Sequence, residues 1–148
     1  MHILLKSRVS RDFRDVYNGF DRNLFEFLLP PGAKVQQFDG SKKGDIVHLT
    51  FSFPLKAEWV SEIIEDTVSD SECYFIDKGT KLPFGITSWT HKHSVKKVDN
   101  QSIIIDDIEF STGNKLLDLI YYPALFISFL PRKRLYQKYF TQAADIKR

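Results

Sequence analysis

The stretch SWTHKHSVKKVDNQSIIIDDIEFS, Ser88 to Ser111, constrains the fold more than any other part of the sequence. Two strand-like runs flank Asp99-Asn100, a dipeptide that tolerates positive φ and is typical of a two-residue hairpin turn. With this turn, His93 lies directly opposite Asp106. A loop one residue longer would place inward residues beside outward ones, so the turn fixes which side chains share a face.

This register predicts two very different faces for the hairpin. The outer face pairs Lys92 with Asp107, a pattern typical of solvent exposure, and the other face is apolar and aromatic with a few polar residues. A buried carboxylate needs a partner, so we expect a protonated His93 to pair with Asp106. Such a pair would favour the charged imidazole. The inward set is Trp89, His91, His93 and Val95 with Ile104, Asp106, Ile108 and Phe110.

Three interpretations of the inward His91, His93 and Asp106 stay open at this point. They can form a satisfied buried network, a polar anchor at the bottom of a ligand cavity, or a metal or general acid–base site. A metal would need a third protein ligand, for which Glu65 and Asp77 are the candidates. We predict no metal and no cofactor.

The N-terminal part predicts one strand followed by two short helices. Residues His2–Val9 form the strand, and Ser10 is expected to cap a helix that runs to Phe20. Asp21 is expected to cap a second helix, which must end before Pro30.

Four further strand signals follow these helices. In the second of them, alternating apolar residues predict a buried face, whereas His48 is expected to point to solvent and Pro54 to end the strand. The four signals cover residues 33–40, 44–53, 57–68 and 71–77. The predicted buried face of the second is Val47, Leu49, Phe51 and Phe53.

The chain ends in a helical pattern that begins after Asn114. Residues 116–130 are apolar almost all round, which predicts a helix buried on both sides or facing an apolar space. Pro123 predicts a break just before it, and Pro131 predicts a kink. We expect the basic segment 132–134 to be solvated.

The amino-acid composition limits the classes of protein to which this chain can belong. The 148 residues fit a single domain, 1–148, and 43% hydrophobic with 27% charged residues is ordinary for a globular protein. A formal net charge of +2, scattered along the chain, does not indicate nucleic-acid binding. The single cysteine, Cys73, excludes an internal disulfide and a cysteine-based zinc site. We find no signal-peptide core and no apolar run of the ~20 residues that span a bilayer, so we expect a cytoplasmic protein.

Several motifs, in order, resemble a known family. LLPPGAKVQQFDGSKKGDIVHLTFSFP is similar to the first half, and EWVSEII, YFID, LPFGITSWTHKHSV and IIIDDIEFS to the second half, of bacterial START-like proteins. These belong to the SRPBCC (Bet v 1-like, polyketide cyclase/dehydrase) superfamily. The resemblance extends from about Val9 to Arg134, and one departure is Leu82, where the family has glycine. The matching pattern positions are Trp59, Ile63, Phe75, Asp77, Trp89, His91, His93, Asp106, Ile108 and Phe110.

The resemblance implies an α+β helix-grip fold, in which a curved antiparallel sheet wraps around a long C-terminal helix and encloses a cavity. Members bind or transfer apolar molecules such as lipids, sterols and polyketides. Together with the aromatic inward face, this favours binding of a hydrophobic or amphipathic small molecule. The expected cavity residues are Phe51, Trp59, Ile63, Trp89, His91, His93, Asp106, Ile108, Phe110, Leu117, Tyr121, Leu125 and Phe129.

Two other functions compete with ligand binding. Some members of the family catalyse cyclisation or hydrolysis, which would make His91 or His93 the general acid–base and Asp106 its orienting partner. The segment ALFISFLPRKR places apolar residues directly before basic ones, a pattern also found at membrane surfaces.

Overall fold

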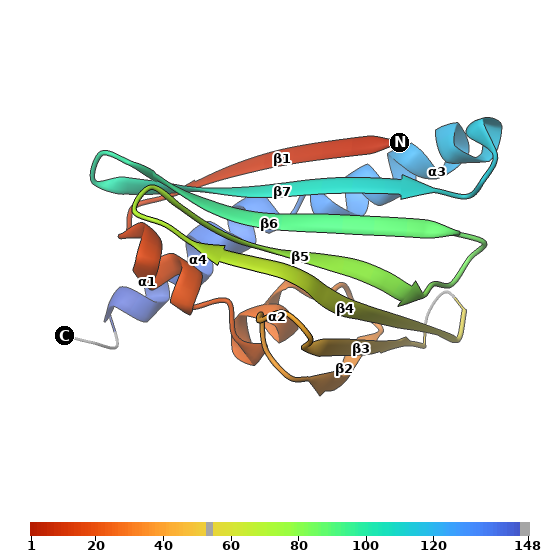
Figure 1. Ribbon diagram of the computed structural model, residues 1–148, viewed down its shortest axis with the longest axis horizontal. Coiled ribbons are helices and arrows are strands. Elements are labelled where there is room, and N and C mark those ends of the chain that lie inside the picture. Colours follow the sequence, from red (N-terminus) through yellow and green to blue (C-terminus); the bar gives the residue numbers. More distant parts are fainter. Residues whose placement is uncertain (53–54, 146–148) are drawn as a thin grey trace.

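The structure is a computed structural model that describes residues 1–52 and 55–145 (Figure 1). One strand, two short helices, six further strands and two C-terminal helices follow each other along the chain. In order they are β1 (His2–Val9), α1 (Phe13–Asn18), α2 (Arg22–Leu28), β2 (Ala33–Phe38), β3 (Ile46–Phe51), β4 (Ala57–Val68), β5 (Glu72–Lys81), β6 (Ser88–Val98), β7 (Gln101–Ser111), α3 (Lys115–Phe129) and α4 (Arg132–Asp145).

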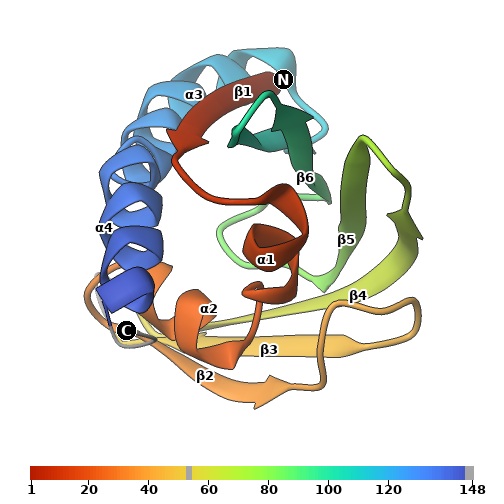
Figure 2. The ribbon, with the colours of Figure 1, turned by 90° about the vertical axis from the view of Figure 1, so that its left-hand side faces the viewer.

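The strands form one antiparallel seven-stranded sheet in the order β1-β7-β6-β5-β4-β3-β2. β1 crosses to the edge beside β7, and the remaining neighbours follow the sequence order. Figure 2 shows that the sheet is strongly curved and that α3 and α4 close its open side. The predicted α+β helix-grip arrangement is therefore confirmed.

The short helices follow their capping residues. The Asp12 side chain accepts hydrogen bonds from the backbone N–H groups of Arg14 and Asp15, so Asp12 caps α1, and the prediction of Ser10 as its cap was wrong. Asp21 caps α2 through the N–H of Leu24, as predicted. Both caps satisfy donors that a helix N-terminus otherwise leaves unpaired.

The β6–β7 hairpin has the predicted register. Val98 pairs with Gln101, and His93 lies opposite Asp106 along the ladder. Asp99 adopts a positive φ of 50°, as the two-residue turn requires. A local turn therefore determines which face of the sheet receives the two histidines.

The middle strands agree with the pattern in part. Val47 and Leu49 are buried as predicted, but His48 is half-buried, with its Nε2 atom enclosed, rather than exposed to solvent. The predicted roles of Phe53 and Pro54 lie outside the described residues. β5 continues beyond the predicted 71–77 to Lys81.

The C-terminal helices correct two expectations. Pro123 lies inside α3, so the predicted break before it was wrong, whereas α3 and α4 do separate around Pro131 as expected. Pro123 lies on the exposed side of the helix, where water can hydrate the carbonyl that its missing N–H leaves free. No described helix combines the length and the hydrophobicity needed to cross a membrane.

The burial of α3 also differs from the prediction. Tyr121, Leu125 and Phe129 pack against a core formed by Ile3, Trp89, Ile108 and Phe110. The opposite side of the helix is exposed and is apolar as well. Of the two expected arrangements, burial on both sides was wrong, because the sheet covers only one side of the helix (Figure 2). The other, a helix that faces an apolar space, agrees with Leu125 and Phe129 bordering a cavity.

Candidate functional site

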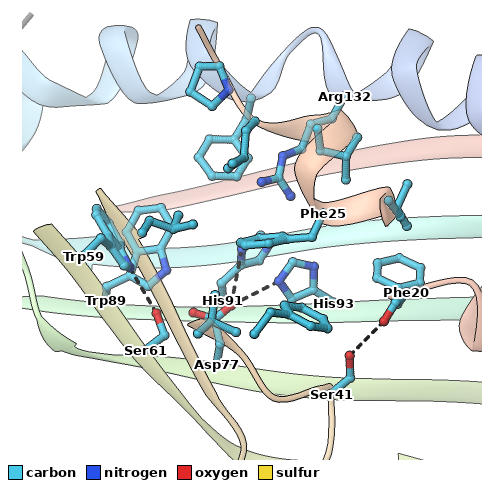
Figure 3. A pocket seen from close by; sticks show the side chains of 18 of the residues that line it. Phe20, Phe25, Ser41, Trp59, Ser61, Asp77, Trp89, His91, His93 and Arg132 are labelled. Carbon is cyan, nitrogen blue, oxygen red and sulfur yellow. Dashed lines mark hydrogen bonds and ion pairs between the residues drawn. The ribbon is translucent and has the colours of Figure 1, made fainter. Parts of the chain in front are cut away.

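A cavity of about 260 Å³ lies between the concave face of the sheet and the helices. Most of its wall is apolar and aromatic, with contributions from β3 to β6 and from α2, α3 and α4. Figure 3 shows Arg132 approaching from the helix side, while His91 and His93 lie on the sheet side. The polar and charged residues along the wall are Asp21, Ser41, Ser61, Asp77, His91, His93, Ser128, Arg132 and Tyr136.

The structure brings most of the expected cavity residues to this wall. They come from three strands, β3, β4 and β6, and from α3, which agrees with a cavity between the sheet and the helix. The expected residues that border the cavity are Phe51, Trp59, Ile63, Trp89, His91, His93, Leu125 and Phe129.

Five expected residues do not border the cavity. Ile108 and Phe110 are buried in the core between the sheet and α3, and Tyr121 packs on that core and donates its hydroxyl to the Phe84 carbonyl. Leu117 is exposed on α3. Asp106 is fully buried one layer behind the cavity wall, where it contacts residues that do border the cavity.

The two histidines and two aspartates bond in a crossed pattern. Asp106 lies opposite His93 on the ladder but accepts its hydrogen bond from His91, at 3.0 Å from Nε2. Asp77 lies opposite His91 but bonds to His93, at 3.1 Å from Nε2. His93 Nδ1 is 3.6 Å from Asp106 Oδ1, so the predicted neighbours lie within ion-pair distance, but the hydrogen-bond reach expected for them was wrong. Side chains lean along the strand, which makes the diagonal neighbour the closer partner.

The helix side completes this arrangement. Arg132 Nη1 lies 3.3 Å from Asp106 Oδ1, and the Tyr136 hydroxyl donates to the same oxygen at 3.3 Å. Arg132 is mostly buried, so the expectation of a solvated basic segment was wrong for this residue. We call the six residues Asp77, His91, His93, Asp106, Arg132 and Tyr136 the polar cluster.

Aromatic rings hold the imidazoles in place. The His91 and His93 rings lie 3.6 Å apart, and the far side of His93 stacks on Phe75 at 4.5 Å. Phe129 meets His91 edge to face, and the Arg132 guanidinium lies 4.4 Å above the Phe129 ring. The orientation of the polar cluster therefore depends on the apolar wall around it.

Burial and charge set the protonation of the polar cluster in opposite directions. Burial raises the pKa of the Asp106 carboxyl, but the hydrogen bond from His91 and the charge of Arg132 outweigh this and hold that pKa well below its usual range. Burial, together with the neighbouring His93, lowers the pKa of His91 to about 4. Asp106 thus pairs with cationic Arg132 and a neutral His91. Because ionised Asp106 can only accept, we assign the His91 proton to Nε2.

Part of the polar cluster has the side chains that could coordinate a metal ion. Asp77, His91 and His93 each offer a ligand atom, and these atoms all lie within 4.8 Å of one another. Asp106 would then bond to the outer nitrogen of His91, as carboxylates commonly do behind a metal-bound imidazole. Asp77 was a candidate third ligand in the sequence, whereas Glu65 bonds to Tyr74 on the sheet surface.

Several residues of the site were not identified as such from the sequence. Arg132 and Tyr136 share a helical stripe with Phe129 and Phe140, and this spacing could have identified them as inward-facing. α2 contributes Leu24, which was predicted to be helical but was not assigned to a cavity. No sequence signal places α2 over the sheet, because that depends on tertiary packing.

Comparisons with known proteins identify the fold. No protein-family model matches the sequence, and no curated protein does. Truncated norcoclaurine synthase from Thalictrum flavum is similar in structure, with a TM-score of 0.66, 18% identity and coverage of 95% of this chain and 92% of that one. The Zhui aromatase/cyclase from Streptomyces sp. R1128 is also similar, with a TM-score of 0.62 and 11% sequence identity. The match covers 93% of this chain and 92% of that one.

A third similar structure is major latex-like protein 151 from Panax ginseng, with a TM-score of 0.62, 15% identity and coverage of 91% and 95%. All three structures match along nearly the whole chain. At these identities the likeness shows the fold alone. The chain has the Bet v 1-like helix-grip fold that its motifs suggested.

Proposed function

We propose that this protein binds a hydrophobic or amphipathic small molecule in the cavity between the sheet and the helices. The observation that carries the proposal is an apolar, aromatic cavity with every residue of the polar cluster except Asp106 along one part of its wall. A wall of this kind buries the apolar body of a ligand and orients its polar group. Two of the similar structures support this, since one is a norcoclaurine synthase and the other an aromatase/cyclase.

The wall suggests how such a ligand lies. Trp89 and Trp59 meet edge to face at 4.7 Å, and the Trp59 indole N–H donates to Ser61. The Trp59 donor is thus satisfied within the protein, and the two rings offer flat apolar surface to the ligand. The polar group of the ligand lies near Arg132 and His91, which provide one cation and one neutral imidazole.

The size of the cavity limits the ligand. At about 260 Å³ it lies near the lower end of the roughly 300–1,000 Å³ typical of ligand pockets. This size favours a single acyl chain or a compact ring system over a lipid with two full chains.

Native mass spectrometry of protein purified from cells, followed by titration with fatty acids, sterols and aromatic polyketides, tests the proposal. Leu125→Trp adds bulk on the cavity side of α3 and should abolish binding, whereas Ile127→Trp adds the same bulk on the exposed side and should preserve it. Absence of any bound ligand or uptake, or equal binding by both variants, would refute the proposal.

A second candidate function is a cyclase or hydrolase that uses the polar cluster as a base. The specific observation in its favour is that His91 borders the cavity, is neutral, and donates its Nε2 proton to ionised Asp106. This leaves Nδ1 free to accept a proton, as in a general base with an orienting carboxylate. His93 is held in the same way by Asp77.

Turnover of polyketide or ester substrates would distinguish this candidate from binding alone. His91→Gln should abolish turnover, and the wild-type rate should fall at low pH as His91 becomes protonated. His2→Gln is the control, because His2 is an exposed histidine that pairs with Asp107 in a similar way. Full activity in His91→Gln and His93→Gln would exclude both histidines as the base.

A further inference from the structure

The side of α3 that faces away from the sheet forms an exposed apolar strip. Leu116 is 69% exposed, Leu119 60%, Ile120 62% and Ile127 65%. These residues recur at helical spacing, with exposed Pro123 and Ala124 between them and exposed Leu130 at the end. We call this set the outer face of α3. In Figure 2, no described segment lies on that side of the helix.

The inner side of the same helix has its own apolar environment. Leu125, Phe126 and Phe129 pack against the core beneath α3. The fold therefore provides an apolar partner for only one of the two apolar sides of this helix. A contiguous exposed apolar surface of this kind is typical of an interaction site.

The charges next to the outer face have one sign. Lys115 precedes it, and Lys133, Arg134 and Lys138 follow it on α4; all four are exposed. Within the described chain, none of the four forms an ion pair. The only acid in α3 is Asp118, which is buried and accepts hydrogen bonds from Ser111 and from the backbone and hydroxyl of Thr112.

These charges distinguish between two possible partners of the outer face, a second copy of this protein and an anionic membrane. In an antiparallel pair of α3 helices, Lys115 of each copy would meet the basic residues at the far end of the other. A parallel pair would bring Lys133 and Arg134 of the two copies together. Both arrangements place like charges side by side, whereas the phosphates of an anionic membrane complement both ends of the strip.

We infer that α3 docks on the surface of an anionic lipid bilayer, with its axis in the plane of the membrane. The outer face enters the boundary between headgroups and acyl chains, and Lys115, Lys133 and Arg134 reach the phosphates. A helix of 15 residues is about 22 Å long, too short to cross the bilayer but suited to lie on it.

Docking in this way places the cavity next to the membrane. Leu125 and Phe129 border the cavity from the inner side of the helix whose outer face contacts lipid. The Tyr121 hydroxyl ties α3 to the loop after β5 through the Phe84 carbonyl, and Phe84 also borders the cavity. Membrane contact itself needs no ligand, so it stands or falls separately from the proposed binding function.

Cosedimentation with vesicles tests the inference. The protein should bind vesicles of equal parts phosphatidylglycerol and phosphatidylcholine, bind vesicles of phosphatidylcholine alone much more weakly, and dissociate as salt is raised. Ile120→Asp should weaken binding about tenfold or more. Val68→Asp is the matched control, because Val68 is 55% exposed on β4 and should leave binding unchanged.

A charge reversal tests the electrostatic part. Lys133→Glu with Arg134→Glu should abolish binding to the anionic vesicles, whereas Lys34→Glu with Lys97→Glu makes the same change in net charge on the sheet and should not. Analytical ultracentrifugation of the same proteins examines the alternative. A dimer that Ile120→Asp dissociates, failure to bind anionic vesicles, or equal binding to both vesicle types would overturn the inference.

Discussion

The sheet wall and the helix wall of the cavity differ in where they place polar and apolar groups. On the sheet, charged and polar side chains are buried: Asp106 is fully enclosed, and His91 and His93 nearly so. On α3, large apolar side chains such as Leu119 and Ile127 face outward. In most proteins charged side chains are exposed and large apolar side chains are buried, so both walls reverse the usual distribution.

The two reversals have different energetic consequences. A buried carboxylate is tolerated only while its partners are in place, so the polar cluster should make the fold sensitive to any change in it. An exposed leucine or isoleucine contributes little to folding, so the outer face of α3 should tolerate substitution. The polar cluster therefore makes the stability of the fold depend on its partners, whereas the outer face of α3 does not.

The largest effect is expected for Asp106→Ala. This change leaves Arg132 and Tyr136 without the oxygen that accepts their hydrogen bonds, so a charge is buried without its partner. We expect a loss of about 3–5 kcal/mol in the free energy of unfolding, measured in urea.

Asp107→Ala is the control for that change. Asp107 is the next residue on β7, pairs with His2 on the surface, and should cost less than about 1 kcal/mol. Combining Asp106→Ala with Arg132→Met should recover part of the loss, because the unpaired charge is removed. Equal losses for Asp106→Ala and Asp107→Ala would end the distinction between the two walls.

The next effect is a pH dependence from His91. Its pKa is lowered to about 4 in the fold, against an ordinary value of 6.5, so the unfolded chain binds the extra proton between these values. Stability should therefore fall as pH falls through this window, by about 3 kcal/mol for this residue. Asp77 and Asp106 have lowered pKa values, so their contribution is present above the ordinary carboxyl range and is lost only at lower pH.

Urea unfolding at a series of pH values measures this slope. His91→Gln should flatten it between about pH 6.5 and 4, because the group that titrates is gone. His2→Gln is the matched control, because it removes an exposed histidine that pairs with Asp107 on the surface and lies outside the polar cluster. If His91→Gln left the pH dependence of the unfolding free energy unchanged, burial would not lower the pKa of His91, and this prediction would be wrong.

A smaller effect is expected for Tyr136→Phe. It removes one donor to Asp106 Oδ1, at 3.3 Å, while His91 and Arg132 still satisfy that oxygen. The expected loss is about 1 kcal/mol, typical of one hydrogen bond. Tyr139→Phe is the matched control, because its hydroxyl makes a longer contact with Asp21 at the surface. A loss of several kcal/mol for Tyr136→Phe would show that the remaining partners of Asp106 cannot hold the charge alone.

The features that could be predicted from the sequence are those that local backbone geometry determines. The turn at Asp99-Asn100 determines the register of β6 and β7, and so the inward position of His91, His93 and Asp106 followed from the residues. The partner of each aspartate did not, because it depends on the lean of side chains and on Asp77 from a third strand.

The helix wall was less predictable for the same reason. Arg132 looked like part of a solvated basic segment, but the turn at Pro131 starts α4 with Arg132 aimed at Asp106. Likewise, an apolar pattern around all sides of α3 cannot tell which side the sheet covers. Both depend on how the helices are placed over the sheet. For Arg132, the only local indication is the helical stripe that it shares with Tyr136 and Phe140.

The smallest effect is expected on the outer face of α3. Ile127→Ala removes a side chain that is 65% exposed, and alanine has the higher helix propensity, so the free energy of unfolding should change by less than about 0.5 kcal/mol. Ile104→Ala, at a fully buried position on β7, should cost about 2–5 kcal/mol in the same assay. If Ile127→Ala instead destabilised the monomer as much as Ile104→Ala, the outer face would belong to the folding core. It would then be unavailable to a membrane, and the contrast between the two walls would fail. If stability is unchanged while vesicle binding drops, the apolar strip serves contact with lipid and not folding.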